Sequence, residues 1–123
     1  MTSPLFQLSG EGTQKTILTF LLGIEEPMLS GLVRRVGRRL RFFRRRPVFV
    51  TDGTRLTVFR EAGEIVEVLP SLTTVGRLPS LPWGDYLQMR RDMLSAKWRP
   101  EMILTYGTSF EEYARVASNP DFD

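Results

Sequence analysis

The chain has 123 residues, the size of one domain, and its 41% hydrophobic and 25% charged residues are ordinary for a globular protein. It contains no Cys and no His, which excludes disulfides, thiolate catalysis and Cys-based zinc sites and removes the commonest general base and metal ligand. The net charge of +3 is uneven, because residues 1–60 carry 11 basic and 4 acidic side chains and residues 61–123 carry 6 basic and 10 acidic ones. This asymmetry indicates an anionic partner for one end, or self-association of unlike ends.

The first part of the chain gives few structural signals. Residues 1–13 contain one Pro and two Gly and are expected to form a flexible lead-in. Residues 9–16 fail as a phosphate loop, because Gln14 stands where the motif requires Gly. Residues 16–24 are an apolar run that periodicity cannot assign to helix or strand, and they are too short to span a bilayer.

With no signal peptide and no Cys, we expect a cytoplasmic protein, and leave open a membrane-peripheral position or a place in a larger assembly.

A basic amphipathic helix is predicted over residues 27–46. Pro27 suits a first helical turn, and the two acidic residues before it favour the positive end of the helix dipole. Apolar residues recur at spacings typical of one helical stripe, namely Leu29, Leu32, Val33, Val36, Leu40 and Phe43. The other surfaces and the end of the segment carry eight arginines: Arg34, Arg35, Arg38, Arg39, Arg41, Arg44, Arg45 and Arg46.

Three interpretations of these arginines compete: the solvated face of a core helix, a site for nucleic acid or an acidic protein, and a helix lying in a membrane surface. Six buried apolar side chains contribute roughly 1.5–3 kcal/mol each, whereas each basic residue near an anionic surface contributes about 1 kcal/mol. The apolar stripe therefore packs on the sheet, which excludes an inserted helix. All eight arginines remain the predicted anionic-partner site, for an acidic protein surface, lipid headgroups or nucleic acid.

An antiparallel β-meander is predicted over residues 47–78. Asp52-Gly53 is a strong hairpin signal between the runs 48–51 and 55–59, and Gly63 belongs to a second turn before residues 65–69. Connections this short leave antiparallel pairing as the economical arrangement. Residues 73–78 are a candidate fourth strand.

The stretch VTDGTRLTVFREAGEIVEVLPSLTTV resembles the strand–hairpin–strand region of bacterial PH-like domains, including GRAM-type relatives. The matching positions are Thr51, Asp52, Arg55, Leu56, Val58, Phe59, Gly63, Val66, Pro70 and Val75. The resemblance implies a small β-barrel closed by a C-terminal helix, and recognition of lipid headgroups or proteins.

Two further segments complete the chain. A helix is predicted over residues 84–98, ended by Pro100, and its flanking Trp83 and Trp98 are interpreted as lids on the core rather than as a base-stacking pair. Residues 102–118 are predicted to form a strand and then a helix that begins with the capping box Ser109-Phe-Glu-Glu.

These elements predict an α+β domain, with a meander of three to five antiparallel strands packed with helices as a PH-like partial barrel. No nucleophile elbow, metal signature or dinucleotide-binding turn is present, so we expect no catalytic residues, no metal, no cofactor and no enzymatic activity. The expected function is a binding or adaptor module that contacts an anionic partner through the arginines. The alternative is a structural subunit of a larger assembly, such as a virion, secretion or membrane complex.

Overall fold

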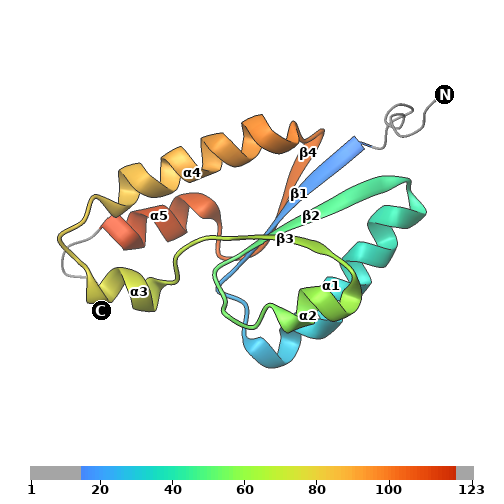
Figure 1. Ribbon diagram of the computed structural model, residues 1–123, viewed down its shortest axis with the longest axis horizontal. Helices are drawn as coiled ribbons and strands as arrows, with labels where there is room; N and C mark the ends of the chain where they lie inside the picture. Colours follow the sequence, from blue (N-terminus) through green and yellow to red (C-terminus); the bar gives the residue numbers. More distant parts are fainter. Residues whose placement is uncertain (1–14, 119–123) are drawn as a thin grey trace.

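The computed structural model describes residues 15–118, which form a four-stranded sheet between two layers of helices (Figure 1). The strands are β1 (Lys15–Leu22), β2 (Arg45–Thr51), β3 (Ile65–Val68) and β4 (Met102–Gly107). They lie in the order β3-β2-β1-β4, and every neighbouring pair is parallel. The helices are α1 (Glu26–Phe42), α2 (Thr57–Ala62), α3 (Leu72–Arg77), α4 (Trp83–Trp98) and α5 (Phe110–Ser118).

The two central strands are apolar on both faces, and this explains the parallel sheet. Every residue of β1 after Lys15 is buried, and so are the last five residues of β2. Successive side chains of a strand point to opposite faces, so Phe20 packs with α4 and α5, whereas Leu21 packs with α1. A strand of this kind needs helices on both faces, which helical crossovers between parallel strands supply.

The predicted antiparallel meander is therefore wrong, and so is the α+β class. Residues 55–59 and 73–78, expected as strands, contribute to α2 and α3 instead. Leu56 and Phe59 both pack against the core under α1. Their spacing of three residues places them on the same face of a helix. Gly63 (φ 71°) ends α2 in the left-handed conformation rather than turning a hairpin.

The PH-like barrel implied by the resemblance is also wrong. Asp52-Gly53 does not close a hairpin, because it begins the connection from β2 to α2. That helix makes the crossover that places β3 parallel to β2, with Val48 opposite Ile65. The matching residues thus describe a strand–loop–helix unit rather than two paired strands.

Outside the meander, the elements follow the sequence more closely. The run 16–24, which the sequence left unassigned, contains most of β1, and the basic helix ends at Phe42, so that Arg45 and Arg46 begin β2. The helix α4 covers the segment expected as helix over residues 84–98, and β4 with α5 covers the strand and helix expected over residues 102–118. Ser109 Oγ accepts a hydrogen bond from the backbone N–H of Glu112 at 3.1 Å, as expected for a capping residue. The lead-in over residues 1–13 lies outside the described residues.

Helices α1 and α2 cover one face of the sheet, and α3, α4 and α5 cover the other (Figure 1). Among residues 15–118, no helix combines the length and the apolar character that crossing a bilayer requires.

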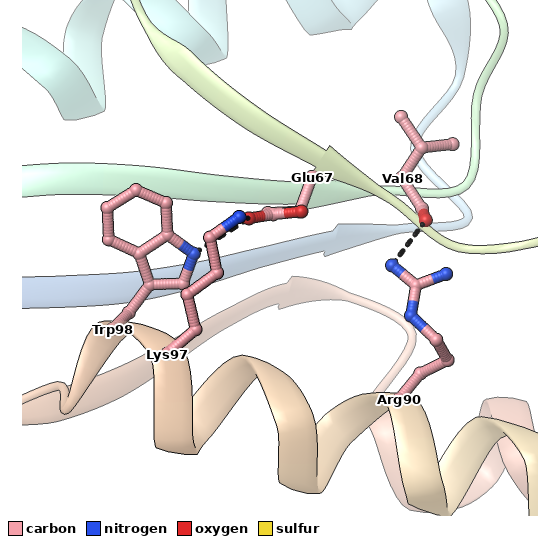
Figure 2. A network of polar contacts seen from close by, with 5 residues as sticks. All are labelled: Glu67, Val68, Arg90, Lys97 and Trp98. Atoms are coloured by element: carbon pink, nitrogen blue, oxygen red, sulfur yellow. Dashed lines mark hydrogen bonds and ion pairs between the residues drawn. The ribbon is translucent and has the colours of Figure 1, made fainter.

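Polar contacts hold α4 to the edge strand β3 (Figure 2). The Glu67 carboxylate accepts hydrogen bonds from Lys97 Nζ and Trp98 Nε1, both at 2.8 Å, and Arg90 donates to the Val68 carbonyl at 3.1 Å. Burial alone would raise the pKa of Glu67, but these two donors together with the positive charges of Lys97 and Arg90 lower it. Trp98 is half-buried against the core, as expected for a lid.

Candidate functional site

In open parallel sheets, ligands bind beyond the carboxyl ends of the strands, where the strand order reverses. Here the order reverses at β1, which lies between β2 and β4. The loops after β1 and β4 close this crevice, because the Thr108 N–H donates to the Leu22 carbonyl at 2.8 Å. A Cβ added at Gly107 would lie 2.4 Å from that carbonyl oxygen, and one added at Gly23 would lie 2.6 Å from Thr108 Oγ1. The open space at this carboxyl edge is therefore displaced toward β2 and β3.

Among residues 15–118, two hollows lie beside the loop that follows β2 at the carboxyl edge. The smaller, of about 190 Å³, lies between the loops that follow β1 and β2 and is lined by Ile24, Glu26, Leu29, Thr51, Asp52, Gly53, Thr54, Arg55 and Phe59. The larger, of about 340 Å³, lies between the loops that follow β2 and β3 and is lined by Asp52, Gly53, Thr54, Ser71, Thr73, Thr74 and Arg77. Residues 52–54, which the sequence indicated as part of a hairpin turn, form a wall common to both hollows.

Asp52 is held at the border of the two hollows. Both of its carboxylate oxygens accept from the Gly23 N–H at 3.4 Å, which links the ends of β2 and β1. Thr51 Oγ1 accepts from the Gly53 N–H at 3.1 Å and fixes the turn that follows β2. The carboxylate is half-buried, so it can still accept hydrogen bonds from a ligand.

Tyr113 supports this edge from the helix α5. Its hydroxyl donates to the Pro70 carbonyl at 2.6 Å, which ties α5 to the connection between β3 and α3. Burial raises the pKa of the Tyr113 hydroxyl, and the negative charge of Asp52 raises this pKa further. Tyr113 therefore stays protonated across the neutral range and acts as a permanent hydrogen-bond donor.

The electrostatics of the edge do not favour a phosphate group at α1. Glu25 and Glu26 occupy the N-terminus of this helix, where nucleotide-binding proteins place the pyrophosphate. Glu26 also forms an ion pair with Arg55 at 2.9 Å. This pair neutralises the positive charge of Arg55, which lines the smaller hollow. Within residues 15–118, no group of three or more acidic side chains could hold a metal ion.

The eight arginines of the predicted anionic-partner site do not lie at the carboxyl edge, and the structure divides them into two sets. Arg41 binds Glu64 at 2.8 Å, Arg45 binds Glu101 at 2.6 Å, and Arg46 donates to Thr16 Oγ1 at 2.8 Å. The other five are exposed and form no ion pair within the described part of the chain: Arg34, Arg35, Arg38, Arg39 and Arg44. The structure thus gathers these five on α1 and on the corner between α1 and β2.

Sequence reasoning missed the polar residues of the carboxyl edge, above all Asp52, Thr73, Arg77 and Tyr113. One signal was available, since Asp52 follows β2, in which Val48, Phe49 and Val50 form an uninterrupted apolar run. A polar residue after a strand that is buried on both faces indicates the carboxyl end of a parallel strand.

The chain matches no protein-family model and no curated protein. Its fold is similar to part of a solved structure, a glycosyltransferase from Rickettsia africae ESF-5, with a TM-score of 0.56 and 10% sequence identity. The similarity covers 85% of this chain and 26% of that one, so this chain spans about a quarter of the length of that protein. At this identity the similarity supports the parallel α/β fold, and it agrees with the correction of the PH-like prediction.

Proposed function

We propose that this chain is a binding domain that recognises a polyhydroxylated ligand of the carbohydrate class at its carboxyl edge. The observation that carries the proposal is the position of Asp52, whose half-buried carboxylate borders both hollows. A carboxylate accepts hydrogen bonds from the hydroxyl groups of a sugar, and the neighbouring hydroxyl and guanidinium groups of Thr54, Thr73 and Arg77 add further donors and acceptors.

The size and charge of the edge favour this ligand class over a nucleotide. Volumes of about 190 and 340 Å³ lie below or near the lower end of the range for drug-sized ligands, which suits one sugar unit better than a dinucleotide. The acidic N-terminus of α1 disfavours phosphate. The glycosyltransferase from Rickettsia africae supports the carbohydrate class by analogy of fold. We propose a binding role, because the lining side chains supply the hydrogen-bond donors and acceptors that recognition of a sugar requires.

The test is ligand-observed NMR with a panel of mono- and disaccharides and with inorganic phosphate, on the parent chain and on Asp52→Asn. Asn keeps the shape of the side chain and an oxygen for the Gly23 N–H, so the variant should fold. Loss of a charged hydrogen bond should weaken sugar binding by about 10- to 100-fold. The matched control is Asp92→Asn on α4, an exposed aspartate that accepts only from Gln88 among residues 15–118. Equal sugar binding by Asp52→Asn and the parent, or binding of phosphate alone, would refute the proposal.

A role as a subunit of a larger assembly is a second proposal, and it has an observation of its own. β4 is an edge strand, and its Met102 and Ile103 are exposed. Edge strands with exposed apolar residues pair readily with other chains. Sedimentation of the purified chain tests this role: concentration-dependent association that Ile103→Lys abolishes would support it, and a monomer at all concentrations would contradict it.

A further inference from the structure

We propose that α1 and the corner that follows it bind the surface of a membrane rich in anionic phospholipids. This proposal concerns a different surface from the carbohydrate site and does not depend on it. The contact surface has two parts. The outer stripe of α1 comprises Met28, Gly31, Arg35, Arg38 and Phe42, and the corner comprises Phe43 and Arg44.

The outer stripe follows from the geometry of the helix. Its residues are spaced by three, four, three and four positions, so they lie along one line on a helix of 3.6 residues per turn. All five are exposed, whereas Leu29, Val33 and Val36 on the opposite side are buried against the sheet. Met28 and Phe42 stand about 21 Å apart, at a rise of 1.5 Å per residue, with the arginines between them. A helix with this arrangement can lie flat on a membrane with an apolar contact near each end.

Phe42 and Phe43 are the strongest indication of a membrane. Phe42 is 79% exposed and Phe43 is 58% exposed. Their rings pack edge to face, with 5.2 Å between the ring centroids. The sequence predicted Phe43 in the buried stripe, but the structure places it outside the core. Single exposed apolar residues are ordinary, whereas two adjacent phenylalanines within a run of arginines form an exposed apolar patch. Aromatic rings of this kind anchor proteins at the headgroup level of a bilayer.

The charge around these rings complements an anionic surface. Five arginines on α1 and the corner form no ion pair within residues 15–118, and residues 27–51 contain no acidic side chain. Glu64, on the neighbouring segment, is enclosed by its pair with Arg41 and is nearly buried. Each arginine near an anionic bilayer attracts the surface independently, so the set provides a strong but salt-sensitive attraction.

The shape of the surface favours lipid over nucleic acid. The outer stripe is the convex side of one helix, and neither of the two hollows of the carboxyl edge opens onto it. A nucleic acid would use the arginines for its phosphates but would leave Met28, at the far end of the stripe, without a partner. The buried stripe stays in the core, so α1 rests on the headgroups without inserting.

The test is co-sedimentation with vesicles of phosphatidylcholine alone and of phosphatidylcholine with phosphatidylserine, at low and high salt. We expect binding only to the anionic vesicles. Each arginine is worth about fivefold, so Arg35→Gln/Arg38→Gln should weaken binding by about 25-fold. The matched control is Arg91→Gln/Arg115→Gln on α4 and α5, which removes the same charge from the opposite side of the sheet and should leave binding within about twofold.

A second pair of variants isolates the aromatic contact. Phe42→Ser/Phe43→Ser keeps the net charge and alters only exposed rings, so the chain should fold, and we expect it to lose most of its vesicle binding at low salt. Met89→Ser/Met93→Ser, which alters exposed methionines of α4, is its control. The proposal is overturned by absence of vesicle binding at low salt, or by equal binding to both kinds of vesicle. It is also overturned if the phenylalanine variant binds vesicles like the parent while a single-stranded oligonucleotide binds more tightly than the vesicles.

Discussion

Tyr113→Phe tests whether a single buried hydroxyl holds α5 to the carboxyl edge. Tyr113 is 1% exposed, and its hydroxyl donates to the Pro70 carbonyl at 2.6 Å. Pro70 directly precedes Ser71, which lines the larger hollow. Phe fills the same space, so the change opens no cavity and removes only the donor. A lost hydrogen bond costs about 0.5–1.5 kcal/mol, and a fully buried carbonyl left without a donor would cost about 1–3 kcal/mol, whereas Pro70 is half-buried. We therefore expect the free energy of unfolding to fall by about 1–2 kcal/mol.

The assay is urea denaturation followed by tryptophan fluorescence. With a slope of about 1–3 kcal/mol per molar urea, the midpoint should fall by about 0.3–2 M with no change in slope. Because the pKa of Tyr113 is raised in the folded state, its stabilisation is complete below the unfolded pKa of about 10 and is lost as the pH rises above it. The difference between parent and variant should therefore narrow above pH 10. Tyr106→Phe is the control, since that hydroxyl has no hydrogen-bond partner among residues 15–118. Equal midpoints for the two variants, or a difference that widens above pH 10, would refute the reasoning.

Four further substitutions test other contacts by the same denaturation assay. Glu67→Gln should lower the midpoint at pH 7, and this loss should shrink as the pH falls below the ordinary pKa of 4.5, because the lowered pKa of Glu67 means that its charged form stabilises the fold; an effect that does not shrink in acid would contradict it. Thr19→Val should raise the free energy of unfolding by about 1 kcal/mol, because this buried hydroxyl has no partner within residues 15–118; a lower midpoint would mean that the hydroxyl is satisfied. Gly107→Ala should lower the free energy of unfolding by about 1–3 kcal/mol, because Gly107 has a φ of 83°, which strains any residue with a Cβ. Gly31→Ala, in the helix α1 with open space around it, should raise the free energy of unfolding by about 0.5–1 kcal/mol. Equal effects of the two substitutions would argue against strain at Gly107.

The three longer helices α1, α4 and α5 were predictable from the sequence, but the short helices α2 and α3 and the sheet were not. The basic helix has an apolar stripe, and the helix α4 is followed by Pro100, which stops it. These signals lie within or beside each segment, so local patterns were enough to predict the two helices. The sheet was wrong because a short turn signal, Asp52-Gly53, outweighed the apolar run of residues 48–50 before it. That run has no polar alternation, which is typical of a strand buried on both faces. Residues 55–59 match both the helical and the strand period, and the hydrogen bond from the Arg60 N–H to the Leu56 carbonyl at 3.1 Å shows that the helix forms.

The arginine cluster was visible in the sequence, but the pairing of its members was not. The charge pattern located all eight arginines, yet the acids that pair with Arg41 and Arg45 lie at positions 64 and 101, far along the chain. Only the folded chain shows which arginines are already used. The carboxyl edge was not predictable for a similar reason, since Asp52, Thr73 and Tyr113 come from three elements that meet only through the parallel order of the strands.

The two proposed surfaces constrain each other through α1. This helix begins at the carboxyl edge, where Glu26 pairs with Arg55, and ends at the corner that carries Phe42 and Phe43 (Figure 1). A helix that connects parallel neighbouring strands runs alongside them, so an α1 lying flat on a bilayer also holds the strands parallel to the bilayer. The carboxyl edge then opens along the membrane surface rather than away from it. A ligand reaching Asp52 would approach from the side, which suits a sugar group presented close to the headgroups and disfavours a bulky ligand on the membrane side of the edge.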